Sequence, residues 1–244
     1  MKITFLGTSH GVPAEDRYCQ SMLIETQNGG YIIDAGAPVM DCLLRIGYDL
    51  KKLKAVFITH MHSDHVYYLF SLLTLASWYY KEMDFDVYVP EQAAIDGITH
   101  FLGVVSSSFP NDRVRLRLIE GCDVYQDEEL KVTAFPTEHM GASKRPAYGY
   151  LLEAEGKKLY ISGDLNGQKI DYQEFVNEEG VDTFVVECAH FPAEKLIDKL
   201  RDCKAKRVMP VHVFPVEKYD VLREAEKELP FEMEYPNDGD CFEI

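Results

Sequence analysis

A mostly apolar run that ends in a cluster of histidines constrains this chain more than any other part of its sequence. The run Leu53–Thr59 (LKAVFIT) is rich in β-branched and aromatic side chains, which predicts a buried strand. Four candidate metal ligands follow at once in HMHSDH: His60, His62, Asp64 and His65. Loops at the ends of strands are where a rigid scaffold presents functional groups. The cluster therefore predicts a functional site at one edge of a sheet.

The spacing within this cluster favours two neighbouring cations. Side chains alternate along an extended segment, so His60 and His62 point to the same side. Asp64 and His65 come where the chain turns into a helix, and they face an adjoining volume. Imidazole and carboxylate groups are suited to zinc, iron or manganese. Several uncharged imidazoles packed together are hard to satisfy without a cation, which favours metal binding over a purely structural cluster.

Three further candidate ligands each follow a predicted strand: His139 after residues 130–135, Asp164 after 158–162 and His212 after 207–210. Taken singly, each of them is as often an ordinary surface or core residue. Taken with the cluster, they give five histidines and two aspartates at strand ends. A site for two metal ions with an open position for water requires such a set.

The remaining pattern predicts an α/β fold. Short strands dominate the first part of the chain, and strand–helix units follow in the last quarter. A helix is expected over Val66–Tyr80. Two stacked sheets with helices on their outer faces accommodate this order. Because no Pro-, Gly- or Ser-rich linker and no repeat divides the sequence, we expect a single domain over residues 1–244.

Charge narrows the partners that the chain is expected to bind. The sequence carries 25 Lys and Arg against 41 Asp and Glu, a net charge of −16. This balance disfavours binding to long nucleic acids, where Lys and Arg supply most of the affinity, and docking on anionic membranes. A bound metal offsets the charge locally, so a small anionic substrate stays compatible with the sequence.

The expected location is the cytoplasm. No segment approaches the roughly 20 apolar residues that span a bilayer, and the start of the chain does not resemble a signal peptide. The six cysteines are scattered without a Cys-x-x-Cys pair, which favours free thiols. A homodimer is compatible with the sequence, because dimers are common among soluble enzymes.

Together these motifs resemble the metallo-β-lactamase superfamily. The resemblance runs from FLGTSHG (Phe5–Gly11) to PVH (Pro210–His212) and includes YIIDAG (Tyr31–Gly36) and SGD (Ser162–Asp164). It implies a four-layer αββα sandwich with two divalent metal ions at one edge, most simply zinc, with manganese or iron as alternatives. It implies three sets of ligands: His60, His62 and His139 for one ion, Asp64, His65 and His212 for the other, and Asp164 as the bridge. It also implies that Asp34 orients a ligand without binding metal, because a ligand histidine usually gives its other N–H to a carboxylate.

Within the superfamily, LGTSHGVP is most similar to the branch of tRNA 3′-endonucleases and small phosphodiesterases. Glu187 and His190 in VECAHFP resemble the glutamate and histidine that this branch uses beside the scissile bond. The resemblance implies that His190 donates a proton to the leaving group and that Asp64 orients the nucleophile or accepts its proton. Three departures disfavour a large folded RNA: no insertion rich in Gly and Lys provides an arm, Leu165 replaces a threonine, and HVFPVEKY only loosely matches H-F-S-x-R-Y.

Four loop residues are candidates for contacts with a substrate phosphate or carboxylate: His10, Arg17, Lys144 and Arg145. They lie after the first strand and after His139, where the substrate usually lies in the superfamily. An ordinary role for them, as solvated charges or within a tight turn, stays equally open.

The sequence thus predicts a metal-dependent hydrolase that cleaves a small phosphodiester, such as a cyclic nucleotide or a cyclic sugar phosphate. Three alternatives stay open: a tRNA 3′-processing endonuclease, a lactone or ester hydrolase, and a non-catalytic metal-binding or ligand-sensing domain. A hydroxide formed at a metal ion attacks carbonyl as well as phosphoryl groups, so the ligands alone do not separate these activities.

Overall fold

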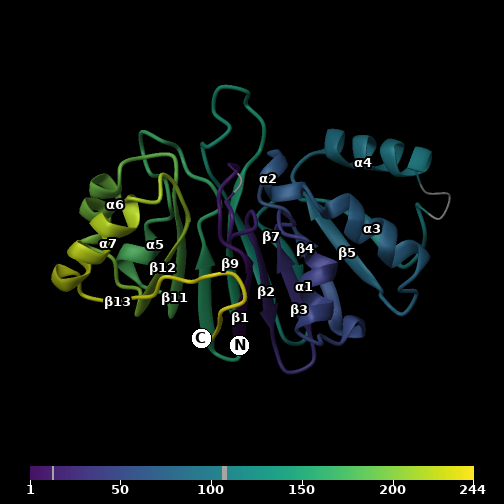
Figure 1. Cartoon of the computed structure of the whole chain (residues 1–244), viewed down its shortest axis with the longest axis horizontal. Helices are drawn as coiled ribbons and strands as arrows, with labels where there is room; N and C mark the ends of the chain where they lie inside the picture. Colours follow the sequence, from purple (N-terminus) through teal and green to yellow (C-terminus); the bar gives the residue numbers. More distant parts are fainter. Residues whose placement is uncertain (13, 106–108) are drawn as a thin grey trace.

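Two mixed β-sheets lie face to face between two layers of helices in the computed structural model, which describes residues 1–12, 14–105 and 109–244 (Figure 1). The first sheet has the order β14-β1-β2-β3-β4-β5-β6. Its strands are β1 (Lys2–Gly7), β2 (Ser21–Glu25), β3 (Gly30–Ile33), β4 (Leu53–Phe57), β5 (Phe85–Val89), β6 (Val114–Leu118) and β14 (Cys241–Glu243). The second sheet has the order β13-β12-β11-β10-β9-β8-β7. Its strands are β7 (Asp123–Gln126), β8 (Lys131–Pro136), β9 (Tyr148–Ala154), β10 (Lys157–Ile161), β11 (Thr183–Cys188), β12 (Arg207–Val213) and β13 (Glu232–Met233).

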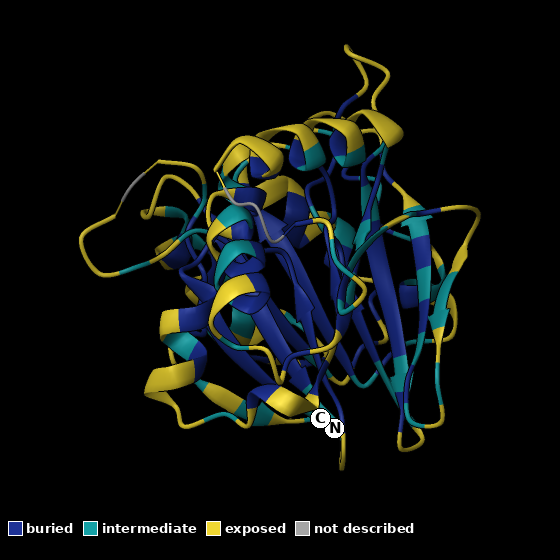
Figure 2. Cartoon of the chain, turned by 90° about the vertical axis from the view of Figure 1, so that its right-hand side faces the viewer, coloured by how far each residue is buried: buried dark blue, intermediate teal, exposed yellow. Residues whose placement is uncertain are grey.

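Each sheet is covered by its own helices. The helices on the first sheet are α1 (Val39–Arg45), α3 (Leu69–Trp78) and α4 (Gln92–Val105). Those on the second sheet are α5 (Phe175–Glu178), α6 (Ala193–Leu200) and α7 (Lys218–Ala225). A short helix, α2 (Ser63–Val66), follows β4, and 3₁₀ turns occur at Leu50–Lys52 and Glu226–Glu228. The outer faces of the helices are exposed and the strands beneath them are buried (Figure 2).

Alternating side chains of the central strands build the core on both faces of each sheet. In β2, Met22 and Ile24 point into the cluster between the sheets, whereas Leu23 packs under the helices. Phe57 and Tyr150 meet between the sheets with ring centroids 5.9 Å apart. The predicted αββα sandwich of the α/β class is therefore confirmed.

The strand directions bring several strand ends to one edge. β10, β11 and β12 are parallel, and β8 runs in the same direction because both β8 and β10 are antiparallel to β9. The carboxyl ends of these four strands consequently meet at one edge, opposite the end where the termini pair through β1 and β14 (Figure 1). Ligand sites of α/β sheets commonly form at such an edge.

The helix predicted over Val66–Tyr80 is interrupted. It begins earlier, as α2, and restarts as α3 after a break at Tyr67 and Tyr68. The backbone of Ala35 explains the break, because its N–H donates to the His65 carbonyl at 2.8 Å and its carbonyl accepts from the Tyr68 N–H at 2.9 Å. The break thus fixes the position of α2 against the first sheet.

Candidate metal centre

The HMHSDH segment divides into an extended part and a helical turn. His60 is fully buried three residues beyond the end of β4, and His62 is still extended, with φ −66° and ψ 148°. Asp64 and His65 lie within α2. One segment therefore places candidate ligands in two adjoining groups.

Three histidines converge in the first group. Nε2 of His60 lies 2.9 Å from Nδ1 of His62, which lies 3.1 Å from Nε2 of His139. His139 reaches this point from the loop after β8, and its Nδ1 donates to the Leu165 carbonyl at 3.3 Å. With Asp164, the three rings offer ligand atoms that all lie within 4.8 Å of one another.

A second group lies beside the first. Oδ2 of Asp64 is 3.2 Å from Nε2 of His212 and 3.6 Å from Nε2 of His65. His212 comes from the end of β12 and has a left-handed backbone, with φ 52°. Strain of this kind is tolerated chiefly where the surrounding structure requires it, often at functional sites.

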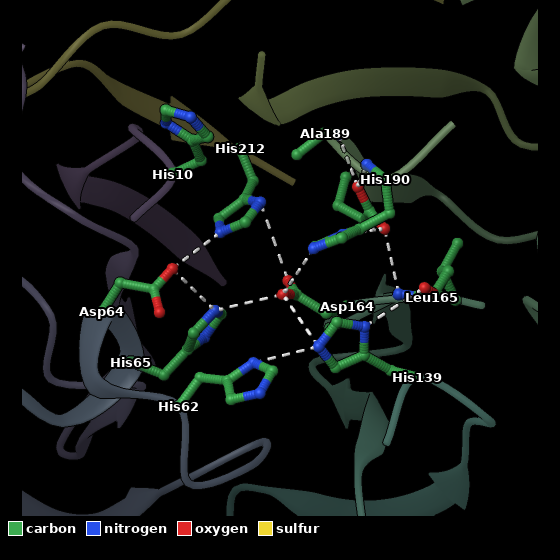
Figure 3. Close-up of polar contacts among 12 residues, drawn as sticks. His10, His62, Asp64, His65, His139, Asp164, Leu165, Ala189, His190 and His212 are labelled. Atoms are coloured by element: carbon green, nitrogen blue, oxygen red, sulfur yellow. Dashed lines mark hydrogen bonds and ion pairs between the residues drawn. The ribbon is translucent and has the colours of Figure 1, made fainter. Parts of the chain in front are cut away.

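Asp164 lies between the two groups (Figure 3). Its Oδ2 is 3.6 Å from Nε2 of His139 and 3.5 Å from Nε2 of His65. Its Oδ1 is 3.8 Å from Nδ1 of His212. The carboxylate therefore lies close to candidate ligands of both groups.

The donor set fits divalent cations. Nε2 of His65 and Nδ1 of His212 are buried without a hydrogen-bond partner among the described residues. Buried polar atoms normally have such a partner, so these two nitrogen atoms indicate where a further bonding partner, such as a cation, fits. Imidazole nitrogens and carboxylate oxygens are the ligands that zinc and its neighbours accept.

The electrostatics suit metal binding as well. Burial lowers the pKa of His60, His62 and His139, so their rings stay neutral with lone pairs available. Burial opposes the charge of Asp164, but the neighbouring rings of His212 and His65 hold the pKa of this carboxyl well below its usual range. The neutral rings of His60, His62 and His139 and the charged carboxylate of Asp164 are the states that metal ligation requires, whereas the pKa of His65 is raised and this ring has to lose a proton first.

Asp34 and Thr59 contact the rings of His65 and His60 through the nitrogen atoms that face away from the centre. Asp34 is buried, with φ 60°, and its Oδ2 accepts from Nδ1 of His65 at 2.7 Å. Its Oδ1 accepts from the Thr59 N–H at 2.8 Å, and the Thr59 hydroxyl lies 3.1 Å from Nδ1 of His60. Such contacts fix which nitrogen of each ring faces the centre.

Glu187 and His190 lie on the open side of the centre. Oε1 of Glu187 accepts from Nδ1 of His190 at 2.9 Å, which turns Nε2 to within 3.8 Å of Oδ2 of Asp164. Burial lowers the pKa of His190, but the hydrogen bond to Glu187 and the charges of Glu187 and Asp164 together raise this pKa above its ordinary value. The ring is therefore protonated more readily than an ordinary histidine.

The four candidate substrate contacts lie in different surroundings. His10 stacks on Phe214 with centroids 3.9 Å apart, and its ring lies 6.0 Å from that of His212. Arg17 donates to Oγ1 of Thr8 at 2.7 Å, to the Pro236 carbonyl and to Asn237. Lys144 is exposed, with φ 55°, and Arg145 pairs with Glu91 at 2.9 Å. The structure thus brings His10 beside the proposed ligands and engages Arg17 and Arg145 with other residues.

Sequence reasoning missed two residues around the site. Thr59 precedes His60 directly, and its hydroxyl also contacts Asp34. Lys218 donates to three carbonyls of the loop that carries His190. The position of Thr59 beside a candidate ligand was a usable signal, and Lys218 lies in HVFPVEKY, whose loose match to H-F-S-x-R-Y gave it no role.

Comparison with protein families assigns the chain. A sequence model of the family described as Anti-Pycsar protein Apyc1 matches residues 1–197. The chain belongs to this family. The part that matches the Apyc1 family contains six of the seven proposed ligands, and His212 lies beyond it.

Curated relatives of this Apyc1 family member include ribonucleases. Ribonuclease Z of Microcystis aeruginosa is 33% identical over 155 residues, which are 62% of this chain and 46% of that protein. Ribonuclease BN of Escherichia coli is 31% identical over 177 residues, 70% of this chain and 54% of that protein. The chain spans about half the length of the curated relatives it matches.

Solved structures share the fold over almost the whole chain. The metallo-beta-lactamase fold protein YhfI from Bacillus subtilis aligns with a TM-score of 0.77 and 18% identity, covering 99% of both chains. The short form of human tRNase Z aligns with a TM-score of 0.72 and 19% identity, covering 100% of this chain and 99% of that one. A diphosphatase from the PhnP family gives 0.73 and 18%, covering 100% and 97%.

These comparisons confirm the predicted resemblance to the metallo-β-lactamase superfamily and its ribonuclease Z branch. Ribonucleases and diphosphatases are hydrolases, so the predicted class is confirmed at the level of the chain's relatives. Of the helices in the described ranges, none is both long and apolar enough to cross a membrane.

Proposed function

We propose that this chain is a hydrolase of one domain over residues 1–244 that uses two divalent cations, most simply zinc, to cleave a small phosphodiester such as a cyclic nucleotide. The observation that carries the proposal is the position of Asp164, whose carboxylate lies within 3.6 Å of His139 in one group of ligands and within 3.5 Å of His65 in the other. In this proposal His60, His62 and His139 hold one ion, and Asp64, His65 and His212 hold the other. A site for two ions supports hydrolysis better than mere metal storage, because it can stabilise both the attacking and the leaving oxygen.

The residues of the chain have distinct parts in this reaction. When bound, the cations lower the pKa of a water molecule and stabilise charge on the phosphoryl oxygens. Asp64 orients the nucleophile or accepts its proton, since its carboxylate lies between His212 and His65. His190 donates the proton that the leaving oxygen needs, and Glu187 holds its ring in place. A proton donor of this kind contributes about 10²–10⁴-fold to the rate.

The charge of the chain supports a small substrate. A net charge of −16 repels a long polyanion, and the repulsion has to be overcome along the whole length of an RNA. A mononucleotide presents its phosphate only to the centre, where the cations offset the charge. Precursor tRNA is the second candidate, because ribonucleases Z and BN are among the relatives.

The direct test compares substrates on protein of measured metal content. We expect close to two divalent ions per chain, and turnover of bis-p-nitrophenyl phosphate and of cyclic mononucleotides. Asp164→Ala should lose metal and activity, whereas His100→Ala, a change of an exposed residue in α4, should lose neither. The proposal is wrong if metal-loaded protein hydrolyses no diester. It is also wrong if precursor tRNA is cleaved with a higher kcat/KM than any small diester.

The leaving group tests the part of His190. His190→Ala should lower the rate for alkoxide leaving groups about 100-fold or more, because these need a proton. The same change should affect nitrophenolate esters much less, because nitrophenolate leaves without one. Equal losses for both substrates would exclude proton donation.

A further inference from the structure

Lys218, the first residue of α7, directs its ammonium group at the loop that carries His190. Nζ donates to the carbonyl oxygens of Cys188 at 2.9 Å, Ala189 at 2.9 Å and Phe191 at 2.6 Å. An ammonium group has three N–H donors, so its full capacity is used on residues 188–191. Hydrogen bonds from a charged donor are also stronger than neutral ones.

The same loop is held on its other side by Glu187. The carboxylate of Glu187 accepts from the N–H groups of Ala189 at 2.6 Å and His190 at 3.3 Å, besides the ring of His190. The N–H of Leu165, next to Asp164, also donates to it at 3.0 Å. N–H groups of the loop therefore donate to the carboxylate of Glu187, and carbonyl groups of the loop accept from the ammonium of Lys218.

The regular pairing of β11 with β12 ends at the loop that Lys218 contacts. The register between β11 and β12 shifts between Glu187 and Cys188, so the backbone beyond this point loses the continuous ladder of a parallel pair. Burial raises the pKa of the Cys188 thiol to about 12, so the thiol stays neutral and does not compete with the carbonyls for the ammonium. The Cys188 carbonyl still accepts from the Phe214 N–H at a long 3.5 Å, and Lys218 supplies the shorter bonds to this carbonyl and to those of Ala189 and Phe191.

Lys218 also belongs to the segment that carries a proposed ligand. It follows His212 by six residues, through the turn at Phe214 and Pro215. The lysine therefore ties the end of β12, which supplies His212, to the loop after β11, which supplies His190.

We infer that Lys218 is a positioning residue that, together with Glu187, holds residues 188–191 in one conformation and keeps His190 facing Asp164. Its kinetic consequence rests on the proposed function, whereas its effect on the loop does not. Without the ammonium, the carbonyls of Ala189 and Phe191 lose the donor that the described residues give them, that of Cys188 keeps only the Phe214 N–H at 3.5 Å, and the loop has to rearrange or take up water.

Amide hydrogen exchange tests the effect on the loop. In Lys218→Met, exchange at the amides of Ala189 and His190 should become at least tenfold faster, because local opening becomes easier. The matched control is Lys195→Met, a change of an exposed residue in α6 that should leave these rates unchanged. Lys218→Gln keeps two N–H donors, so its exchange rates should lie between those of the wild type and Lys218→Met. This variant decides the test if Lys218→Met does not fold. Wild-type protection in the folded variant would overturn the inference whether or not the protein hydrolyses diesters.

Kinetics then test the consequence for His190. Lys218→Met should lower kcat for an alkoxide leaving group about tenfold, change turnover of nitrophenolate esters little and leave metal content unchanged. In the His190→Ala background the same substitution should have no further effect, because residues that act as a unit are not additive. If His190→Ala shows the leaving-group effect and Lys218→Met does not, or if the two losses multiply, Lys218 does not act through His190 and only the proposed function stands.

Discussion

Nδ1 of His65 donates to Oδ2 of Asp34 across 2.7 Å, within a pair of side chains that are each about 1% exposed. The bond leaves Nε2 of the same ring directed at Asp64 and Asp164, where no residue that the structure describes forms a hydrogen bond with it. Asp34 therefore sets which nitrogen of His65 is available at the centre. It does so although its own carboxylate contacts none of the other proposed ligands.

The first prediction concerns this pair. Asp34→Asn should weaken metal binding about 10–100-fold, the usual cost of removing such an orienting carboxylate. The reason is that an amide nitrogen in place of Oδ2 cannot accept from Nδ1, so the proton moves to Nε2 and blocks ligation. Asparagine tolerates the left-handed backbone of this position, so the fold should be kept. Competition with a chelator measures the affinity.

A half-buried, hydrogen-bonded aspartate elsewhere serves as the control for this substitution. Asp127 accepts from Tyr31 at 2.6 Å and from Tyr125 at 2.8 Å. Asp127→Asn should lower stability without changing metal affinity. Unchanged affinity in Asp34→Asn, or the same loss in both variants, would contradict the role assigned to Asp34.

The second prediction is that metal binding releases a proton from His65. Burial disfavours a charged ring, but the carboxylates of Asp164 and Asp34 hold the pKa of His65 well above its usual range. Without metal the ring is therefore protonated at neutral pH, and it has to lose this proton to become a ligand. Affinity should rise with pH up to the raised pKa and fall as pH drops below it.

Calorimetry in two buffers of different ionisation enthalpy measures this release at one pH. In His65→Ala the proton count should drop by about one, because the titrating ring is gone. A binding enthalpy that does not depend on the buffer would show that His65 is already neutral.

The third prediction concerns a close approach of two backbones. A Cβ added at Gly36 would overlap the carbonyl oxygen of Asp64 and crowd that of Gln20. Gly36→Ala should therefore displace α2, lower stability by about 2 kcal/mol or more and reduce metal affinity. Gly97, in α4, has no atom within 4 Å of such a Cβ, and Gly97→Ala should raise stability by about 0.5–1 kcal/mol. Thermal denaturation of both variants checks the difference, and equal effects would contradict it.

The proposed ligands were accessible from sequence because local spacing carries most of the information. His60 and His62 share a side because they alternate on an extended segment, and Asp64 and His65 follow within one helical turn. No such rule connects Lys218 to residues 188–191, because the contact forms only when β11 and β12 pair. A contact that depends on the pairing of two distant strands has no periodic pattern in the sequence.

The fold likewise divides into elements that local sequence patterns predict and features that contacts between distant segments determine. The apolar run Leu53–Thr59 contains β4, and the strand predicted over residues 207–210 lies within β12. β7 has no such pattern, because its four residues, DVYQ, place two apolar side chains next to each other and give no alternation. The break between α2 and α3 was missed because the hydrogen bonds that cause it come from Ala35, some 30 residues earlier.

The fourth prediction distinguishes two roles for Arg17, which the sequence offers as a substrate contact. Its guanidinium donates to Thr8 and to residues 236–237, and it lies 5.5 Å from the ring of Tyr219. Arg17→Met should therefore lower stability by about 1–2 kcal/mol, because removal of this partly exposed charged donor leaves its acceptors unpaired. Lys144→Met should leave stability unchanged, because that side chain is exposed. The melting temperature and the KM for a small diester separate the roles: a raised KM with an unchanged melting temperature in Arg17→Met would assign Arg17 to the substrate instead of the scaffold.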